Sequence, residues 1–298
     1  MTIDHSAIRF GRQVLRGFSQ CAFQSNEIAG GIFVLAVAVF NWRMAVAYVL
    51  AVVLGTLTAR VLKGIDALLD LGLYGFNSGL LGLALCNFFQ QSLLLWLSIA
   101  IFAIAAAAVT VAMAKWLPFP FLAAPFILSF WALWLVSEAV GLSKIDLGAF
   151  PPAPVMWGTA IISALGSALF SSSIISGGVF LVGIAISNWR HAIIAVLGAF
   201  IAVALGEHVG AAGAAINTGF IGFNAVLAAL AAYVIVAADL RLVVLGAFLS
   251  TWLASYVYRG APVPVLASGF VIAIWLILAL GWINPRFNAA QQKVAEGQ

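Results

Sequence analysis

The sequence predicts an all-α polytopic membrane protein built from two inverted structural repeats. Of its 298 residues, 65% are hydrophobic and only 7% are charged, which is too little polar surface to cover a water-soluble domain. Long apolar runs such as residues 93–114 lack the in-out alternation of barrel strands, so helices must satisfy the peptide groups within the membrane. The third observation is that the second half of the chain repeats motifs of the first.

The repeat is clearest in GLYGFNSGLLG, residues 72–82, which returns 147 residues later as GFIGFNAVLAA, residues 219–229. At the same spacing, AGGIFVLAVAVFNWRMA, residues 29–45, matches SGGVFLVGIAISNWRHA, residues 176–192. Self-similarity at a fixed spacing indicates a duplicated structural unit.

A second spacing extends the repeat toward the end of each half. The segment PFLAAPF, residues 120–126, matches PVLASGF, residues 264–270, at a distance of 144 residues. We therefore predict a first inverted repeat over residues 1–147, with a basic amphipathic N-terminus. The second inverted repeat is expected over residues 148–298, with a short polar C-terminal tail.

Each half is expected to cross the membrane about five times, judged from its apolar runs. In the first half these runs are broken at the Asn-Trp-Arg turn of residues 41–43, at residues 63–70 and at residues 116–120. A mid-chain loop follows at residues 143–154, and the Asn-Trp-Arg turn recurs at residues 188–190. An odd number of crossings inserts the second half upside down and places a solute path where the halves meet.

The charged residues predict orientation rather than a nucleic-acid partner. A net charge of +4 is small, and the basic residues are dispersed along the chain. Arg9, Arg12 and Arg16 precede the first span, while Arg286 and Lys293 follow the last, so both termini are expected in the cytoplasm. The three arginines at helical spacing predict an amphipathic surface helix, with a frayed basic tail as the alternative.

The repeated Phe-Asn pair is the candidate lining of the path. A buried asparagine amide needs hydrogen-bond partners, so Asn77 and Asn224 are expected to brace Phe76 and Phe223 toward the axis. Two phenylalanines facing each other across a narrow path would form a flat apolar slot. Such a slot would admit a thin, planar, neutral solute and exclude hydrated ions.

The remaining polar residues do not predict an enzyme. The sequence contains no metal-type His-Glu spacing, nucleophile-base pair or phosphate-binding loop, so no catalytic residue, metal or cofactor is expected. Cys21 and Cys86 lie in apolar settings and are expected to be inert core residues. The roles of Glu138, Glu207 and His208 stay open. The last two could supply an acceptor or a proton site at a pore mouth, or form a satisfied loop pair.

These motifs, together with SQCAFQSNEIAGGIFVL (residues 19–35) and LPFPFLAAPF (residues 117–126), resemble the repeated signatures of the urea transporter (urea channel) family of bacterial type. The resemblance spans essentially the whole chain. It implies a multi-pass protein of the cell membrane, in a bacterial inner membrane, that assembles as a homotrimer in the lipid bilayer. Each protomer would hold its own pore between two halves of five spanning helices and one tilted, half-spanning helix. Urea would pass through it passively, between aromatic rings and beside ladders of oxygen acceptors.

The resemblance places ten residues of this chain along the path. They are Gln20, Phe23, Phe76, Leu80, Ala123, Ser167, Phe170, Phe223, Leu227 and Ala267. Three of them depart from the family pattern. Ser167 stands where the family tends to have a longer amide or acid, and Ala123 and Ala267 stand where it has threonine.

These departures leave alternatives open for the solute. Ammonia or a short amide is a candidate if the missing hydroxyl groups matter for urea. An ion-coupled secondary transporter is the alternative from another class, because it also uses inverted repeats. Such a transporter needs a titratable or cation-binding site at mid-membrane, and neither copy of the slot motif contains an acidic residue.

Overall fold

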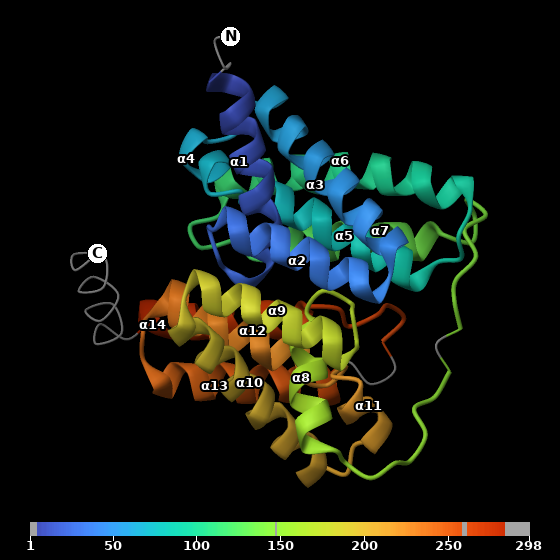
Figure 1. Cartoon of the computed structure of the whole chain (residues 1–298), viewed down its shortest axis with the longest axis vertical. Coiled ribbons are helices and arrows are strands. Elements are labelled where there is room, and N and C mark those ends of the chain that lie inside the picture. Colours follow the sequence, from blue (N-terminus) through green and yellow to red (C-terminus); the bar gives the residue numbers. More distant parts are fainter. Residues whose placement is uncertain (1–4, 147, 258–260, 284–298) are drawn as a thin grey trace.

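Two groups of helices, one from each half of the chain, lie against each other in the computed structural model (Figure 1). The structure describes residues 5–146, 148–257 and 261–283. Within these residues every regular element is a helix, which confirms the all-α polytopic class. The C-terminal basic residues Arg286 and Lys293, used above to predict orientation, lie outside the described residues.

The described part of the first half, residues 5–146, holds seven α-helices and one short 3-10 helix. Asn26, Asn41 and Ser92 each accept a hydrogen bond from a backbone N–H of the helix that follows, and such N-caps fix where a helix begins. The elements are α1 (His5–Ser19), η1 (Gln20–Ala22), α2 (Glu27–Phe40), α3 (Trp42–Val61), α4 (Asp66–Asp70), α5 (Gly75–Phe88), α6 (Leu93–Trp116) and α7 (Ala124–Val136).

The second half repeats this order, with Ser173 and Asn188 as N-caps at the positions of Asn26 and Asn41. It differs where two helices end in a π-helical turn, which the first half lacks among its described residues. The elements are α8 (Trp157–Ser167), α9 (Ile174–Ser187), α10 (Trp189–His208), α11 (Gly213–Asn217), α12 (Phe223–Ala231), η2 (Ala232–Val236), α13 (Leu240–Trp252), η3 (Leu253–Val257) and α14 (Ser268–Ile283).

The two halves also share unusual backbone conformations at matching positions. Phe23 and Phe170 have φ angles of 59° and 57°, and Leu122 and Leu266 have φ angles of 50° and 48°. Residues other than glycine seldom adopt this left-handed region, so the agreement is not a general property of helical chains. The turns that precede α2, α7, α9 and α14 are therefore built in the same way in both halves.

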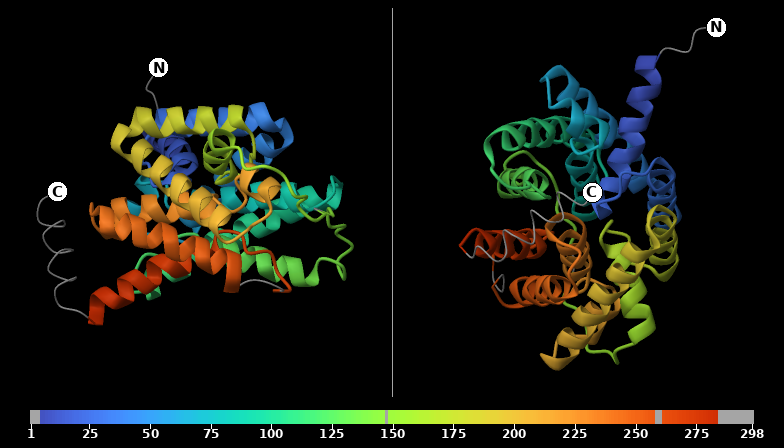
Figure 2. Two further views of the ribbon diagram at one scale, coloured as in Figure 1. Left: turned by 90° about the horizontal axis from the view of Figure 1, so that it is seen from below. Right: turned by 90° about the vertical axis from the view of Figure 1, so that its left-hand side faces the viewer.

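Contacts between the halves are reciprocal. Trp131 in α7 donates its indole N–H to the carbonyl of Pro264 at 2.8 Å, and Trp275 in α14 donates to the carbonyl of Pro120 at 2.9 Å. An exchange of partners of this kind is the mark of a two-fold relation between two units. On the same interface α2 packs against α9 (Figure 2). There the ring centroids of Phe33 and its counterpart Phe180 lie 4.3 Å apart.

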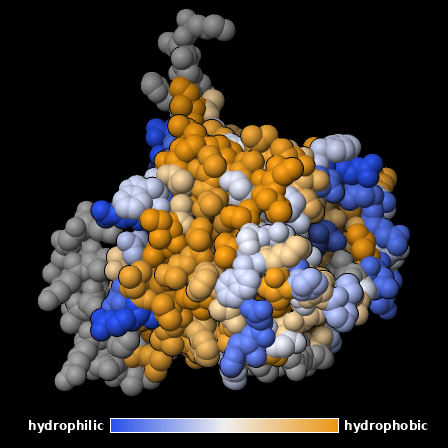
Figure 3. All heavy atoms as spheres, turned by 60° about the horizontal axis from the view of Figure 1, so that its bottom comes forward, coloured by the Kyte–Doolittle hydropathy of each residue, from blue (hydrophilic) through white to orange (hydrophobic). Residues whose placement is uncertain are grey.

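Several helices are long and apolar enough to cross a membrane. Among the described residues α3, α6 and α10 pass this test singly, and α1 with α2 passes it as a pair bent by 67°. Five shorter apolar helices accompany them, so the number of about five crossings per half stays a prediction. Exposed Trp42, Trp116 and Trp189 stand at ends of these spans, as is typical of membrane interfaces. Apolar side chains cover the middle of the face drawn in Figure 3.

Helix α1 is anchored by ion pairs to the elements beside it. Arg12 and Arg16 both bond the carboxylate of Glu27 at the start of α2, at 2.9 and 3.0 Å. Arg9 bonds Asp70 of α4 at 2.8 Å. The segment that carries these arginines is therefore helical rather than frayed, since each arginine has an acidic partner. That α1 lies at a membrane surface stays a prediction.

Candidate functional site

Asn77 links α5 to the turn that begins α7. Its amide nitrogen Nδ2 donates to the carbonyl of Leu122 at 3.2 Å, and its oxygen Oδ1 accepts from the backbone N–H of Phe126 at 3.1 Å. All of these groups are buried, so the side chain satisfies one donor and one acceptor that water cannot reach. We call this pair of bonds the asparagine clamp.

The second half has the same asparagine clamp. Asn224 of α12 donates to the carbonyl of Leu266 at 2.9 Å and accepts from the N–H of Phe270 at 3.0 Å. Sequence reasoning expected the two asparagines to brace the phenylalanines next to them. Their hydrogen bonds go instead to the left-handed turns at Leu122 and Leu266, because those turns leave backbone groups without helical partners.

The slot phenylalanines are buried beside rings of their own half. Phe76 lies nearly parallel to Phe121, with an interplanar angle of 20° and ring centroids 6.4 Å apart. Phe223 contacts Phe220 edge-on, with the centroids also 6.4 Å apart. Each of these two rings therefore has a partner within its own half. That Phe76 and Phe223 face each other across one slot stays a prediction.

Among the predicted path residues, Phe23 and Phe170 have rings that contact the other half. Phe23 lies edge-on to Phe270 at 6.2 Å, and Phe170 lies edge-on to Phe126 at 6.2 Å. Each follows one tight helical turn and has the left-handed conformation described above. Phe126 and Phe270 are also the residues whose N–H groups the asparagine clamps hold. Each asparagine clamp is thus connected, through Phe126 or Phe270, to a ring contact that crosses the interface.

Gln20 and Ser167 hold equivalent backbone groups in spite of their different lengths. Gln20 donates through Nε2 to the carbonyl of Leu71 at 2.8 Å, and Ser167 donates through Oγ to the carbonyl of Thr218 at 2.7 Å. Both side chains are buried. The shorter serine therefore keeps the structural bond, and what it lacks is the side-chain carbonyl oxygen that Gln20 retains as a hydrogen-bond acceptor.

Ala123 and Ala267 lie within the same left-handed turns, one residue after Leu122 and Leu266. Both are buried, at 1% and 4% exposure, and offer only a methyl group to the interior. Leu80 and Leu227 follow the slot phenylalanines by one helical turn and are also buried. The structure therefore places all ten predicted residues in or beside the interior of the helical assembly.

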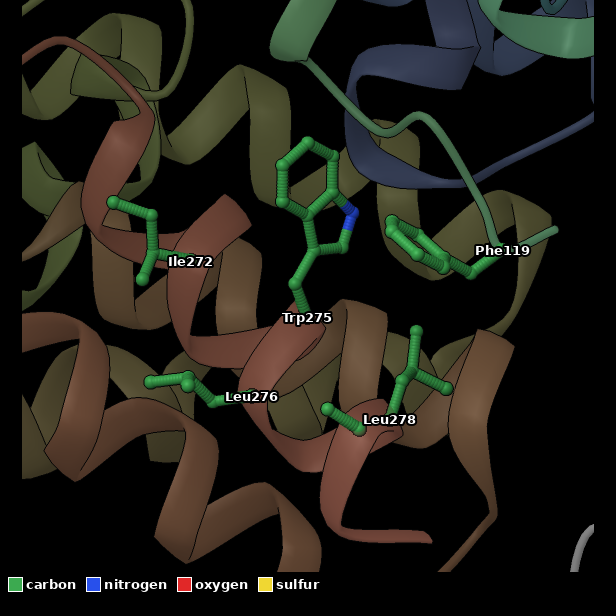
Figure 4. Close-up of a pocket in the computed structure, with 6 residues that line it drawn as sticks. Phe119, Ile272, Trp275, Leu276 and Leu278 are labelled. Atoms are coloured by element: carbon green, nitrogen blue, oxygen red, sulfur yellow. The ribbon is translucent and has the colours of Figure 1, made fainter. Parts of the chain in front are cut away.

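Two cavities lie outside this group of residues. One, of about 300 Å³, is apolar and is lined along α14 by Ile272, Trp275, Leu276 and Leu278, with Phe119 opposite (Figure 4). The other, of about 550 Å³, is charged and lies beside α1, α3 and α4. Neither cavity is lined by any of the ten predicted path residues.

The acidic residues that the sequence left open lie on the surface. Glu138 pairs with Lys144 at 3.0 Å, and the Lys144 ammonium group lies 4.6 Å from the Trp134 ring centre. Glu207 and His208 are exposed at the end of α10. Among the described side chains, no three of the His, Cys, Asp and Glu residues gather as a metal site requires.

Sequence reasoning missed the residues that join the two halves. Trp131 and Trp275 were not singled out, although they are 144 residues apart, the same spacing as Pro120 and Pro264. The predicted repeat at a spacing of 144 residues covers only residues 120–126 and 264–270. The same spacing, applied further along α7 and α14, pairs the two tryptophans.

Comparison with known proteins gives a match over most of the chain. A family model described as "Urea transporter" matches residues 12–282. Urea transporter 1 of Ovis aries and of Capra hircus are each 32% identical to this chain over 90 residues, which is 30% of this chain and 23% of each relative. Urea transporter 1 of Mus musculus is 32% identical over 89 residues, with the same shares. The chain thus matches less than a quarter of the length of these curated relatives.

Proposed function

Because the chain belongs to the urea transporter family, we propose that it is a facilitative, channel-like pathway for urea between two inverted repeats. The repeats are residues 1–147 and residues 148–298. The observation that carries this proposal is that the family match, residues 12–282, includes both copies of the slot motif with its asparagine clamp. Reciprocal contacts between the halves support a path along their interface.

The aromatic residues would select the solute by shape and charge. Urea is planar and neutral, so it can lie flat against a ring such as Phe76 without the desolvation cost of an ion. The nearly parallel Phe121 gives this side of the path a second flat wall. Leu80 and Leu227 would keep the rest of the path apolar, so that hydrated ions lose water without compensation.

Urea also needs acceptors for its N–H groups. At the end of the path beside Gln20, which we call the Gln20 mouth, the side-chain oxygen of Gln20 can accept a hydrogen bond from urea. The Nε2 group of the same side chain is bound to the Leu71 carbonyl, which holds the amide in place. Ser167 has no equivalent oxygen beyond its hydroxyl group. We therefore propose that the two mouths bind urea unequally, with the Gln20 mouth as the stronger site.

The proposal extends to membrane and assembly. Arg60 lies in the last turn of α3 and Lys115 lies in the last turn of α6. Positively charged residues at the ends of membrane helices favour the cytoplasmic side. We propose a multi-pass protein of a bacterial inner membrane with both termini cytoplasmic. The family relation further supports a homotrimer in the lipid bilayer that needs no cofactor and does not act as an enzyme.

Stopped-flow light scattering on proteoliposomes tests the function directly. We expect rapid flux of urea, with less for acetamide, formamide and ammonia, and no dependence on voltage or proton gradient. Phe76→Ala or Phe223→Trp should abolish selective urea flux, because the first removes a flat wall of the path and the second overfills the buried space. Phe248→Ala on the exposed surface is the matched control and should keep full flux.

One outcome would favour another class of protein. Accumulation of urea against its gradient, driven by protons or sodium ions, would rule out a passive channel and support the ion-coupled transporter. Flux of ammonia equal to that of urea in the unmodified protein would instead indicate a less selective channel for small neutral solutes.

A second test concerns the missing hydroxyl groups. We expect that Ala123→Thr combined with Ala267→Thr raises urea flux or affinity, because each threonine adds a hydrogen-bond donor and acceptor beside the path. Ala123→Val combined with Ala267→Val adds nearly the same volume without a hydroxyl group, and should not raise either quantity. Unchanged urea transport in the threonine variant would count against this explanation of the alanines.

A further inference from the structure

The charged cavity of about 550 Å³ lies where α1, the end of α3 and α4 meet. It is separate from the ten path residues, and the proposed urea function gives it no role. Its lining residues are Ser6, Arg9, Gln13, Arg60, Lys63, Gly64, Asp66 and Leu69.

The carboxylates at this cavity already have cationic partners. Arg9 bonds both oxygens of Asp70 at 2.8 Å and reaches Asp66 at 3.5 Å. Gln13 donates to Asp70 at 2.7 Å, and these hydrogen bonds lower the pKa of Asp70 to about 2. Asp70 therefore stays ionised at neutral pH, and Arg9 offsets its charge.

Two further cations remain, Arg60 and Lys63. Arg60 donates through Nε to the side-chain oxygen of Gln13 at 2.9 Å, and its guanidinium group lies 4.8 Å from the ring centre of Phe10. Gln13 is itself only 2% exposed, so this contact fixes the direction of the guanidinium group. The ion pairs of the described residues leave Arg60 and Lys63 without a carboxylate, and the two Nη groups of Arg60 are suited to a forked anion such as phosphate.

The cavity lies at a membrane surface. Helix α3 has 20 residues, about the length that spans the hydrocarbon core, and Arg60 is in its last turn. Next in sequence to the lining residues Arg60, Lys63 and Gly64, the side chains of Val61, Leu62 and Ile65 are exposed, that of Val61 to 78%. A cationic cavity with an exposed apolar rim matches the two parts of a phospholipid, a charged headgroup and acyl chains.

The equivalent positions of the second half do not carry these cations. At the spacing of 147 residues, Arg60 corresponds to Glu207, Lys63 to Gly210 and Gln13 to Ala160. The duplicated fold therefore carries these cations at one membrane face only. Under the proposed orientation this is the cytoplasmic face, where anionic lipids attract basic pockets between helices.

We propose that this cavity binds the headgroup of an anionic phospholipid. Its phosphate would contact Arg60 and Lys63, and its acyl chains would lie along Val61, Leu62 and Ile65. Residues of α1 and α4 also line the cavity, so a bound headgroup would lie between these helices and the end of α3. The proposal does not depend on which solute passes between the halves.

Binding of a defined lipid to the purified full-length protein tests the proposal. In detergent micelles, added phosphatidylglycerol should raise the unfolding temperature saturably and should stay bound in native mass spectrometry. Phosphatidylcholine and inorganic phosphate at the same concentration should do neither. Lys63→Gln should weaken phosphatidylglycerol binding roughly five-fold, as expected for one cation near an anionic lipid, and Arg60→Gln combined with Lys63→Gln should abolish saturable binding.

Lys115→Gln is the matched control. Lys115 is an exposed cation in the last turn of α6, and it does not line the cavity. It should leave lipid binding unchanged. Equal binding of phosphatidylcholine, displacement of the lipid by inorganic phosphate, or an equal loss in Lys115→Gln would overturn the proposal. The variant with Arg60→Gln loses the Arg60–Gln13 hydrogen bond and can fold less well for that reason alone. Lys63 is exposed, so the single variant Lys63→Gln tests lipid binding without that effect. Urea flux is measured separately, so failure of one proposal leaves the other standing.

Discussion

Gly30→Ala is expected to prevent correct assembly of the first half, whereas Gly31→Ala is expected to be neutral or slightly stabilising. A Cβ atom on Gly30 would overlap the carbonyl oxygen of Leu15 in α1, and a backbone atom cannot move aside as a flexible side chain can. The penalty should exceed the ~1–3 kcal/mol of ordinary overpacking. Gly31 has open space at this position, and alanine there gains about 0.5–1 kcal/mol of helix stability. Thermal unfolding in detergent measures both effects.

The second half supplies an independent copy of this experiment. A Cβ atom on Gly177 would overlap the carbonyl oxygen of Ile162 in α8, while Gly178 has open space. Gly177→Ala should therefore yield aggregated protein in size-exclusion chromatography, and Gly178→Ala should give the unmodified profile. Equal behaviour of the two adjacent variants, in either half, would contradict the close contacts of α1 with α2 and of α8 with α9.

Asn77→Leu is expected to lower both stability and urea flux. Leucine has a similar size but leaves the N–H of Phe126 and the carbonyl of Leu122 buried without partners. At ~1–3 kcal/mol for each buried group, the free energy of unfolding should fall by about 2–6 kcal/mol. Flux should fall as well, because the turn at Leu122 holds Ala123 and Phe126, which we propose lie beside the path. Chemical or thermal unfolding and stopped-flow urea uptake provide the two measurements.

Ser129→Ala provides the control for this prediction. Ser129 lies in α7 and is buried, but its hydroxyl oxygen has no hydrogen-bond partner among the described residues. Removing it should cost little stability and should leave flux intact. Asn224→Leu should reproduce the loss seen with Asn77→Leu, since its bonds to Leu266 and Phe270 are equivalent. A stable Asn77→Leu variant with full flux would show that the asparagine clamp has no part in holding the path.

The sequence was sufficient to predict the class of the protein and the duplication. Composition indicated a membrane protein, and the long apolar runs without strand alternation indicated helices. The spacing of 147 residues paired Gly72 with Gly219, which share a left-handed backbone conformation in the structure. These features are predictable because they depend on local physics: an apolar run must be helical in the membrane, and a tight turn favours glycine.

Side-chain partners were harder to predict. The motif indicated that Asn77 and Phe76 belong together, but not that Asn77 would bond the turn at Leu122 or that Phe76 would lie against Phe121. Such contacts depend on how α5 and α7 approach each other, and no spacing within one helix contains that information. The bend of 67° between α1 and α2 was also not predicted, because it depends on packing as well as on local sequence.

The tryptophan–proline hydrogen bonds between α7 and α14 make each half self-complementary. Each half carries both the donor and the acceptor, so two separate copies of one half contain every group that this pair of contacts needs. Joining the two units in one chain allows each to carry different residues away from these contacts. Arg60 and Lys63, which correspond to Glu207 and Gly210 in the second half, are an example.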